Sequence, residues 1–283
     1  GARAGACCIP DYARLLAGTH GETLARQVRQ VVVVGRPTLS RSVQALIARA
    51  PALAVAGFGA RWSDAPAHAE SVLPAVPASW LERTPGEAVD RGWLEQWRAA
   101  AEPTPAESWG PRAIAAAFAV AVGAGIGVVG SSGPVRALDR VLPAAAPGAA
   151  PTLIANRGLA GIDGTVSTAV GVALATRRPV LALMGDVTFL HDAGGLLVGP
   201  REERPRLRIV VVNDGGGTIF AGLEHAAASA ADVERVFTTP HGAHLAALCE
   251  AYRVPHLSVA SQEGLTAALA APCDGLEVIE AVL

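Results

Sequence analysis

The sequence predicts an α/β protein made of two doubly wound domains with parallel sheets. Short apolar segments rich in valine, leucine and isoleucine alternate with longer segments of helical pattern along the chain. Such continuous apolar strands between helices are typical of parallel sheets that helices cover on both faces. Residues 103–111, PTPAESWGP, contain three prolines and read as a linker. We therefore expect one domain over residues 1–102, incomplete at its start, and a second over residues 103–283.

The first half contains a small strand–helix–strand unit. Residues 28–34 end in a strand of four valines, and residues 53–57, LAVAG, read as a second strand. The helix between them is expected to end at Ala50, with Ser40 as its N-cap. Residues 92–102, GWLEQWRAAAE, have the pattern of an amphipathic helix.

The second half alternates more regularly, as expected for a larger parallel sheet. Strands are predicted at residues 126–130, 152–156, 180–184, 208–213 and 276–283. Helices are predicted at residues 112–122, 163–176, 189–199 and 244–254.

Composition excludes some classes of function. The 23 basic and 25 acidic residues nearly balance, and no basic stripe indicates a nucleic-acid partner. Residues 113–130 lack charge and reach the lower limit of a membrane span, but Gly123–Gly125 interrupt them, so we expect a buried helix followed by a strand. We therefore expect no membrane span.

The cysteines and the start of the chain bear on location and completeness. The adjacent Cys7 and Cys8 favour a reduced compartment over a disulfide framework, and we expect the cytoplasm. Residues 1–10 lack the pattern of a signal peptide. Because Met184 is the only methionine, we expect a fragment, a processed product or an incomplete chain.

Two carboxylates stand out because each follows an apolar strand. Asp186 comes after residues 180–184, and Asp214 follows 28 residues later, after residues 208–213. A crossover of this length makes the two strands parallel neighbours, so both carboxylates would face one crevice at the carboxyl edge of the sheet. Two close carboxylates repel each other unless a cation lies between them, and Mg²⁺ prefers hard oxygen ligands. The pattern equally allows Asp186 as a helix cap and Asp214 as a turn residue.

The glycines after Asp214 extend this hypothesis. Gly215–Gly217 would let the backbone approach a ligand closely. The residues by themselves thus predict a magnesium–diphosphate site.

Several motifs resemble those of thiamine-diphosphate enzymes. GD at residues 185–186 followed by ND at 213–214 is similar to the signature of this superfamily, usually written GDG and then NN. Residues 155–174, ANRGLAGIDGTVSTAVGVAL, resemble a specific branch, the 2-succinyl-5-enolpyruvyl-6-hydroxy-3-cyclohexene-1-carboxylate synthases of menaquinone biosynthesis. GDVTFLHDAGGLL at 185–197 and GGGTIF at 215–220 match the same branch.

Further motifs resemble the central domain of this branch, namely GRPTLSR at 35–41 and RWSDAP at 61–66. The resemblance thus covers a central domain and a C-terminal domain with the diphosphate-binding fold. It does not extend to the pyrimidine-binding domain that comes first in the family.

The resemblance implies roles for individual residues. The implied ligands of Mg²⁺, or of Mn²⁺ in its place, are Asp186, Asp214 and the carbonyl of Gly216. Ile162 would be the wedge that bends thiamine diphosphate, and further cofactor contacts would come from Gly161, Gly185, Asp186 and Ile219. Substrate contacts would come from Ser132, Arg136, Arg157, Ile219, Phe220 and Leu223. Of these, Ser132, Arg136 and Arg157 would hold carboxylates during catalysis, a task that suits arginine.

Two departures from the family pattern concern the site. Asp214 replaces the commoner asparagine and still provides a hard oxygen. Gly133 stands where a polar residue is frequent in the SxPxR segment, which removes one contact with substrate or diphosphate.

The resemblance implies a transferase that decarboxylates 2-oxoglutarate and adds the succinyl unit to isochorismate, working as a homo-oligomer. The glutamate that activates the cofactor belongs to the pyrimidine-binding domain, so we expect no activity from this chain alone. The alternatives are a non-catalytic homologue that binds magnesium and diphosphate, or another carboligase or decarboxylase of the superfamily.

Two further motifs are weaker. GIGVVG at 125–130 fits the dinucleotide-binding pattern, but an alanine-rich helix precedes it and no acidic residue follows at the required distance. HGAH at 241–244 has two histidines without an evident third metal ligand, and we expect it to begin the helix at 244.

Overall fold

The structure is a computed structural model that describes residues 7–9, 11–57, 69–80, 82, 91–101, 108–142, 149–222 and 228–283. The chain divides into two compact units, residues 1–104 and residues 105–283. The RWSDAP motif, most of the expected linker and Leu223 lie outside the described residues.

The first unit contains a three-stranded parallel sheet in the order β1-β2-β3. Its strands are β1 (Gln30–Val34), β2 (Ala52–Ala56) and β3 (Ser71–Leu73). Helix α3 (Arg41–Arg49) connects β1 to β2, which confirms the predicted strand–helix–strand unit. The sequence analysis missed β3, because three residues are too few to show a periodic pattern.

The remaining helices of this unit are α1 (Tyr12–Ala17), α2 (Thr19–Ala25), the 3₁₀ turn η1 (Ala78–Trp80) and α4 (Arg91–Ala100). Ser40 occupies the N-cap position of α3, but its side chain does not cap the helix. Its hydroxyl lies 2.9 Å from the hydroxyl of Ser42 instead.

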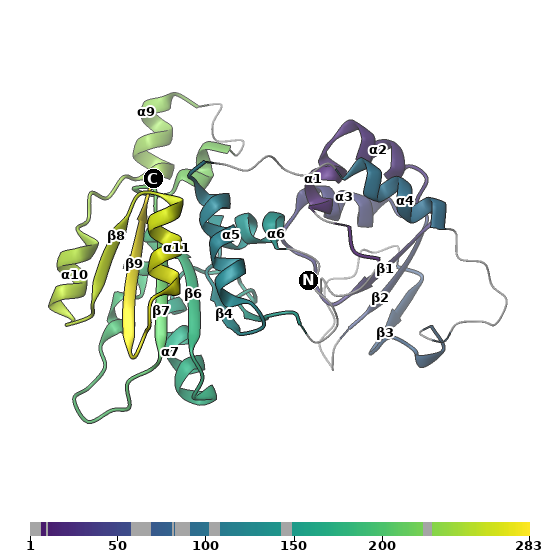
Figure 1. Ribbon diagram of the computed structural model, residues 1–283. Helices are drawn as coiled ribbons and strands as arrows, with labels where there is room; N and C mark the ends of the chain where they lie inside the picture. Colours follow the sequence, from purple (N-terminus) through teal and green to yellow (C-terminus); the bar gives the residue numbers. More distant parts are fainter. Residues whose placement is uncertain are drawn as a thin grey trace. The chain divides into compact units, whose positions relative to one another are not determined.

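The second unit contains a six-stranded parallel sheet in the order β5-β4-β6-β7-β9-β8. Figure 1 shows β6, β7, β9 and β8 side by side. Its strands are β4 (Ile126–Val129), β5 (Thr152–Ile154), β6 (Val180–Gly185), β7 (Leu207–Asn213), β8 (His256–Val259) and β9 (Leu276–Val282). All pairs are parallel, and β6 lies beside β7 as predicted.

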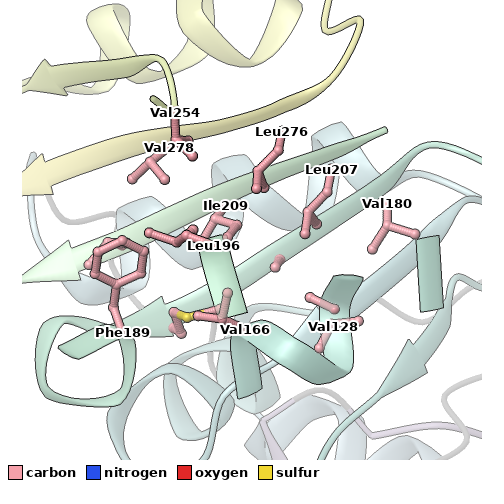
Figure 2. Packing of buried hydrophobic residues seen from close by; sticks show 14 of the residues in the cluster. Val128, Val166, Val180, Phe189, Leu196, Leu207, Ile209, Val254, Leu276 and Val278 are labelled. Atoms are coloured by element: carbon pink, nitrogen blue, oxygen red, sulfur yellow. The ribbon is translucent and has the colours of Figure 1, made fainter. Parts of the chain in front are cut away.

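Helices cover both faces of this sheet, because alternate strand residues point to opposite sides. Ile209 and Val211 face a layer formed by α7 (Thr165–Thr176), α8 (Asp186–His191), the 3₁₀ turn η2 (Ala193–Leu196) and α10 (Leu245–Ala251). Val210 and Val212 face the opposite layer of α5 (Pro111–Val122), α6 (Gly133–Val141) and α11 (Gln262–Ala270). Figure 2 shows the first layer, where Val166, Phe189 and Leu196 pack against apolar strand residues. The doubly wound α/β class is therefore confirmed for this unit.

The predicted elements agree with the structure except at a few places. The helical stretch predicted near 189–199 is divided and begins earlier, since α8 begins at Asp186 and ends at His191, and Gly194 and Gly195 lie in the separate turn η2. The helices α1, α2, α6 and α11 and the strand β8 were not predicted from the sequence. The unit further contains the 3₁₀ turn η3 (Thr218–Gly222), the short helix α9 (Ala230–Val233) and the π turn η5 (Glu234–Thr238).

The uncharged segment at 113–130 divides as expected. Helix α5 ends at Val122, and β4 begins at Ile126. Within the described part of the chain, no helix has both the length and the apolar character needed to cross a membrane.

Candidate active site

The two predicted carboxylates lie at the carboxyl ends of adjacent strands. Asp186 follows the last residue of β6, and Asp214 follows the last residue of β7. Gly185 pairs in register with Val212, so the two strands end at nearly the same level. This edge is where parallel α/β sheets bind their ligands.

A cavity of about 340 Å³ opens at this edge. The expected site residues that line it are Ser132, Ile162, Gly185, Asp186, Asp214, Gly216, Ile219 and Phe220. The loops that follow β4, β5, β6 and β7 thus meet in one place, although they are far apart in the sequence. Arg136, Arg157 and Gly161 do not line the cavity.

Asp186 is buried, with only 2% of its surface exposed. Its Oδ1 accepts a hydrogen bond from the backbone N–H of Val187 at 2.6 Å. Its Oδ2 lies 3.0 Å from Nε2 of His241. Asp186 is the first residue of α8 and Gly185 occupies the N-cap position, so the alternative in which Asp186 caps this helix is not what the structure has.

Asp214 lies in the turn after β7 and is partly buried. Burial raises the pKa of its carboxyl group, and the charge of Asp186 raises this pKa further, whereas the hydroxyl of Thr218, which donates to Oδ2, lowers it. The charge of Asp186 is thus close enough to Asp214 to raise the pKa of the Asp214 carboxyl group. An arrangement of two like charges at one cavity is stabilised by a cation.

The glycines after Asp214 form a tight loop with a positive φ of 80° at Gly215. A Cβ atom at Gly216 would lie 2.5 Å from the carbonyl oxygen of Thr238, and one at Gly217 would lie 2.8 Å from that of Phe237. Side chains therefore do not fit at these two positions, and the backbone itself faces the cavity.

Hydrogen bonds fix the loop that carries Ile162. The side chain of Asn156 donates to the hydroxyl of Thr168 at 3.1 Å, which ties the start of this loop to α7. Arg157 donates to the hydroxyl of Ser131 at 3.4 Å, which joins the loops after β4 and β5. Arg136 lies on α6 and is exposed.

The sequence analysis missed some residues that support the site. Asp192 accepts hydrogen bonds from the backbone and the hydroxyl of Ser167, at 2.7 and 3.0 Å, and so holds the first turn of α7. The HGAH motif indicates His241 only as a possible metal ligand, and nothing local in the sequence indicates its contact with Asp186 across 55 positions. The helix expected from the HGAH motif does begin here, with His244 as the N-cap of α10.

The side-chain atoms of Asp186 and Asp214 that could bind a metal ion at the cavity are carboxylate oxygens, and these suit a hard divalent cation. In the described residues no group of three or more His, Cys, Asp or Glu side chains could hold a metal ion. A cation here would therefore need Asp186, Asp214, a backbone carbonyl such as that of Gly216, and oxygens from a ligand. The crowded glycine loop presents backbone instead of side chains to the cavity, so these residues fit a metal–diphosphate group.

Comparison with known proteins identifies the class of protein. Residues 141–281 match the family model described as thiamine pyrophosphate enzyme, C-terminal TPP binding domain. The crystal structure of benzoylformate decarboxylase from Polynucleobacter necessarius has the same fold, with a TM-score of 0.61 at 18% identity over 96% of this chain and 60% of that chain. Residues 141–281 thus match the C-terminal domain family of the thiamine pyrophosphate enzymes.

Sequence relatives narrow this class. The chain is a homologue of the 2-succinyl-5-enolpyruvyl-6-hydroxy-3-cyclohexene-1-carboxylate synthases, as the motifs at 155–174 and 185–197 indicated. It is 47% identical to the synthase of a Nocardioides species over the whole of this chain and 55% of the relative. It is 43% identical to that of an Arthrobacter species, over 94% of this chain and 46% of the relative, and 43% identical to that of Kineococcus radiotolerans, over 100% and 52%. The chain spans about half the length of these relatives.

Proposed function

We propose that the chain is the cofactor-binding part of a thiamine-diphosphate-dependent synthase. This synthase decarboxylates 2-oxoglutarate and adds the succinyl unit to isochorismate. The observation that carries the proposal is the joint opening of Asp186 and Asp214 onto one cavity, together with Ile162 and the crowded Gly216–Gly217 backbone. The synthases to which the chain is similar support this choice of reaction.

The proposed metal is Mg²⁺, or Mn²⁺ in its place. Asp186, Asp214 and the carbonyl of Gly216 would hold the ion, and the diphosphate of the cofactor would complete its shell. The two carboxylates would then lose their mutual repulsion, which the raised pKa of Asp214 reflects in part.

Thiamine diphosphate, when bound, would supply the carbanion chemistry that decarboxylation of a 2-oxo acid requires. Ile162 and Ile219 line the cavity with apolar surface and would support the rings of the cofactor, and Gly161 and Gly185 would provide backbone contacts.

The proposed substrates both carry carboxylates. Ser132 lines the cavity, and we assign it, with Arg136 and Arg157, to binding these carboxylates. Phe220 lines the apolar side of the same cavity, and Leu223 follows it in the sequence. By holding both substrates, these residues would lower the entropic cost of bringing them together.

A pyrimidine-binding domain, from another chain or another part of the protein, would complete the site, and the assembly would be a homo-oligomer in the cytoplasm. Two exposed apolar side chains support a covering partner. Leu159, in the loop of Ile162, is 102% exposed, and Leu197, directly after η2, is 71% exposed.

Calorimetry tests the cofactor site. Thiamine diphosphate is titrated into the chain at a series of Mg²⁺ concentrations, with wild type, Asp186→Ala and the control Asp274→Ala. Asp274 is exposed and precedes β9, at the amino edge of the sheet. We expect Mg²⁺-dependent binding in the wild type and the control and its loss in Asp186→Ala. Equal binding by all three proteins would contradict the assignment.

Turnover tests the reaction. The chain is mixed with the N-terminal half of the Nocardioides relative, both substrates, thiamine diphosphate and Mg²⁺, and we expect product only when both proteins are present. Cofactor binding without turnover would leave a non-catalytic homologue as the function.

A further inference from the structure

His241 lies against the proposed metal site but is not one of its expected residues. Its Nε2 is 3.0 Å from Oδ2 of Asp186, and both side chains are largely buried, with 18% and 3% exposure. The two residues are 55 positions apart in the sequence, so only the folded chain brings them into contact.

The hydrogen bonds of His241 determine which ring nitrogen carries the hydrogen. The backbone N–H of Ala243 donates to Nδ1 at 2.9 Å, so Nδ1 is an acceptor. In the neutral ring the hydrogen is then on Nε2, which donates it to Asp186. The imidazole therefore has a fixed orientation, with its donor directed at one carboxylate oxygen.

The segment that carries His241 also contacts the glycine loop. The N–H of Gly217 donates to the carbonyl of Thr238 at 2.7 Å, and the N–H of His241 donates to the carbonyl of Gly215 at 3.3 Å. A side chain at Gly216 would collide with Thr238 and Pro240. Residues 238–241 thus contact both Asp186 and the glycine loop at residues 215–217.

We infer that His241 is a positioning residue that orients the carboxylate of Asp186 for the metal ion. With Oδ1 held by the N–H of Val187 and Oδ2 by His241, the carboxylate has one orientation, and its remaining lone pairs are available to a cation. Hydrogen bonds to metal ligands commonly set their orientation, and their loss costs about 10- to 100-fold in metal affinity. The inference rests on the proposed function, since it assumes that Asp186 binds the ion.

Two substitutions separate the two hydrogen bonds of His241. Asn can keep an acceptor near Nδ1 for Ala243 but is too short to reach Asp186. Gln can place its amide N–H near the position of Nε2 but loses the bond from Ala243. His244→Asn is the matched control, because His244 is exposed and its side chain makes no capping hydrogen bond.

The experiment measures the Mg²⁺ concentration that gives half-maximal binding of thiamine diphosphate to the full chain, by calorimetry. Thermal unfolding without metal verifies that each variant is folded. We expect His241→Asn to raise this concentration about 10- to 100-fold, while His241→Gln and His244→Asn stay close to wild type.

The outcomes separate this inference from the proposed function. No Mg²⁺-dependent binding by the wild type, or undiminished binding by Asp186→Ala, would overturn the proposed function and the inference with it. Loss of binding in Asp186→Ala combined with an unchanged His241→Asn would overturn the inference alone. Equal weakening by Asn and Gln would also overturn it, because a merely structural role would not distinguish the two.

Discussion

A set of buried and partly buried polar residues supports the glycine loop at residues 215–217 from inside the sheet. Glu280 on β9 accepts a hydrogen bond from the side chain of Asn213 at 2.6 Å, and its other oxygen lies 2.8 Å from Nε2 of His256. The carbonyl of the Asn213 side chain in turn accepts the N–H of Gly215 at 3.1 Å. Asn213 thus fixes the turn that presents Asp214, and burial of Glu280 is tolerated because both of its oxygens have partners.

Asp214→Asn is expected to raise the thermal stability of the metal-free chain at neutral pH. The pKa of Asp214 is raised in the folded state, mainly by burial, so the folded chain binds this proton more tightly than the unfolded chain. The contribution of Asp214 to the free energy of unfolding therefore falls as the pH rises above 3.8, the ordinary pKa of this group. At higher pH the charged carboxylate destabilises the folded chain. Asparagine removes that charge.

Unfolding temperatures of both proteins, measured without metal from neutral pH downward, check this prediction. The difference between them should shrink as the pH approaches 3.8. A variant that is less stable than wild type at neutral pH would contradict it.

At the scale of elements, the contact between α5 and β4 depends on a glycine. Gly127 is buried in β4, and a Cβ atom there would lie 2.8 Å from Leu153, 3.2 Å from Phe118 and 3.3 Å from Val122. The side chains of α5 and β5 thus occupy the space that a methyl group would need. By contrast, Gly171 in α7 is exposed, with nothing within 4 Å of its Cβ position.

These two glycines predict opposite effects of the same substitution. Gly127→Ala should destabilise the chain by about 1–3 kcal/mol, the usual cost of overpacking a core. Gly171→Ala should stabilise it by up to about 1 kcal/mol, because alanine is the better helix former. Chemical denaturation with a constant m-value measures both changes. Equal effects of the two substitutions would contradict the packing described for β4.

At the scale of the whole molecule, each unit has its own apolar core. Val33, Ile47, Leu53 and Val55 form that of the first unit, whereas two clusters on opposite faces of the larger sheet form those of the second. The residues found to line the candidate cavity run from Pro111 to Phe220 and all belong to the second unit.

A fragment of residues 105–283 is therefore expected to bind thiamine diphosphate with the same Mg²⁺ dependence as the full chain. Its circular dichroism should show a cooperative unfolding transition, which establishes that it folds. Calorimetry on both proteins then compares their affinities. A folded fragment that does not bind, beside a full chain that does, would show that residues 1–104 contribute to the site.

The sequence by itself determined the positions of most strands and of several helices, namely α3, α4, α5, α7 and α10, and it predicted that the strands before Asp186 and Asp214 are neighbours. Apolar runs such as residues 208–213 indicate buried strands, because the side chains of each run by themselves favour its burial away from water. The crossover between β6 and β7 is also a local unit, so its length was enough to make the two strands neighbours. The family motifs at 155–174 and 185–197 were likewise readable without coordinates.

Only the tertiary structure decided which distant residues support that site. The contacts of His241 with Asp186 and of Glu280 with Asn213 span 55 and 67 positions. They depend on the strand order β6-β7-β9 and on the path of residues 238–241 past the glycine loop. No periodic pattern within a single segment of the sequence predicts such contacts, because they form only when separate segments pack into one sheet and its covering layers.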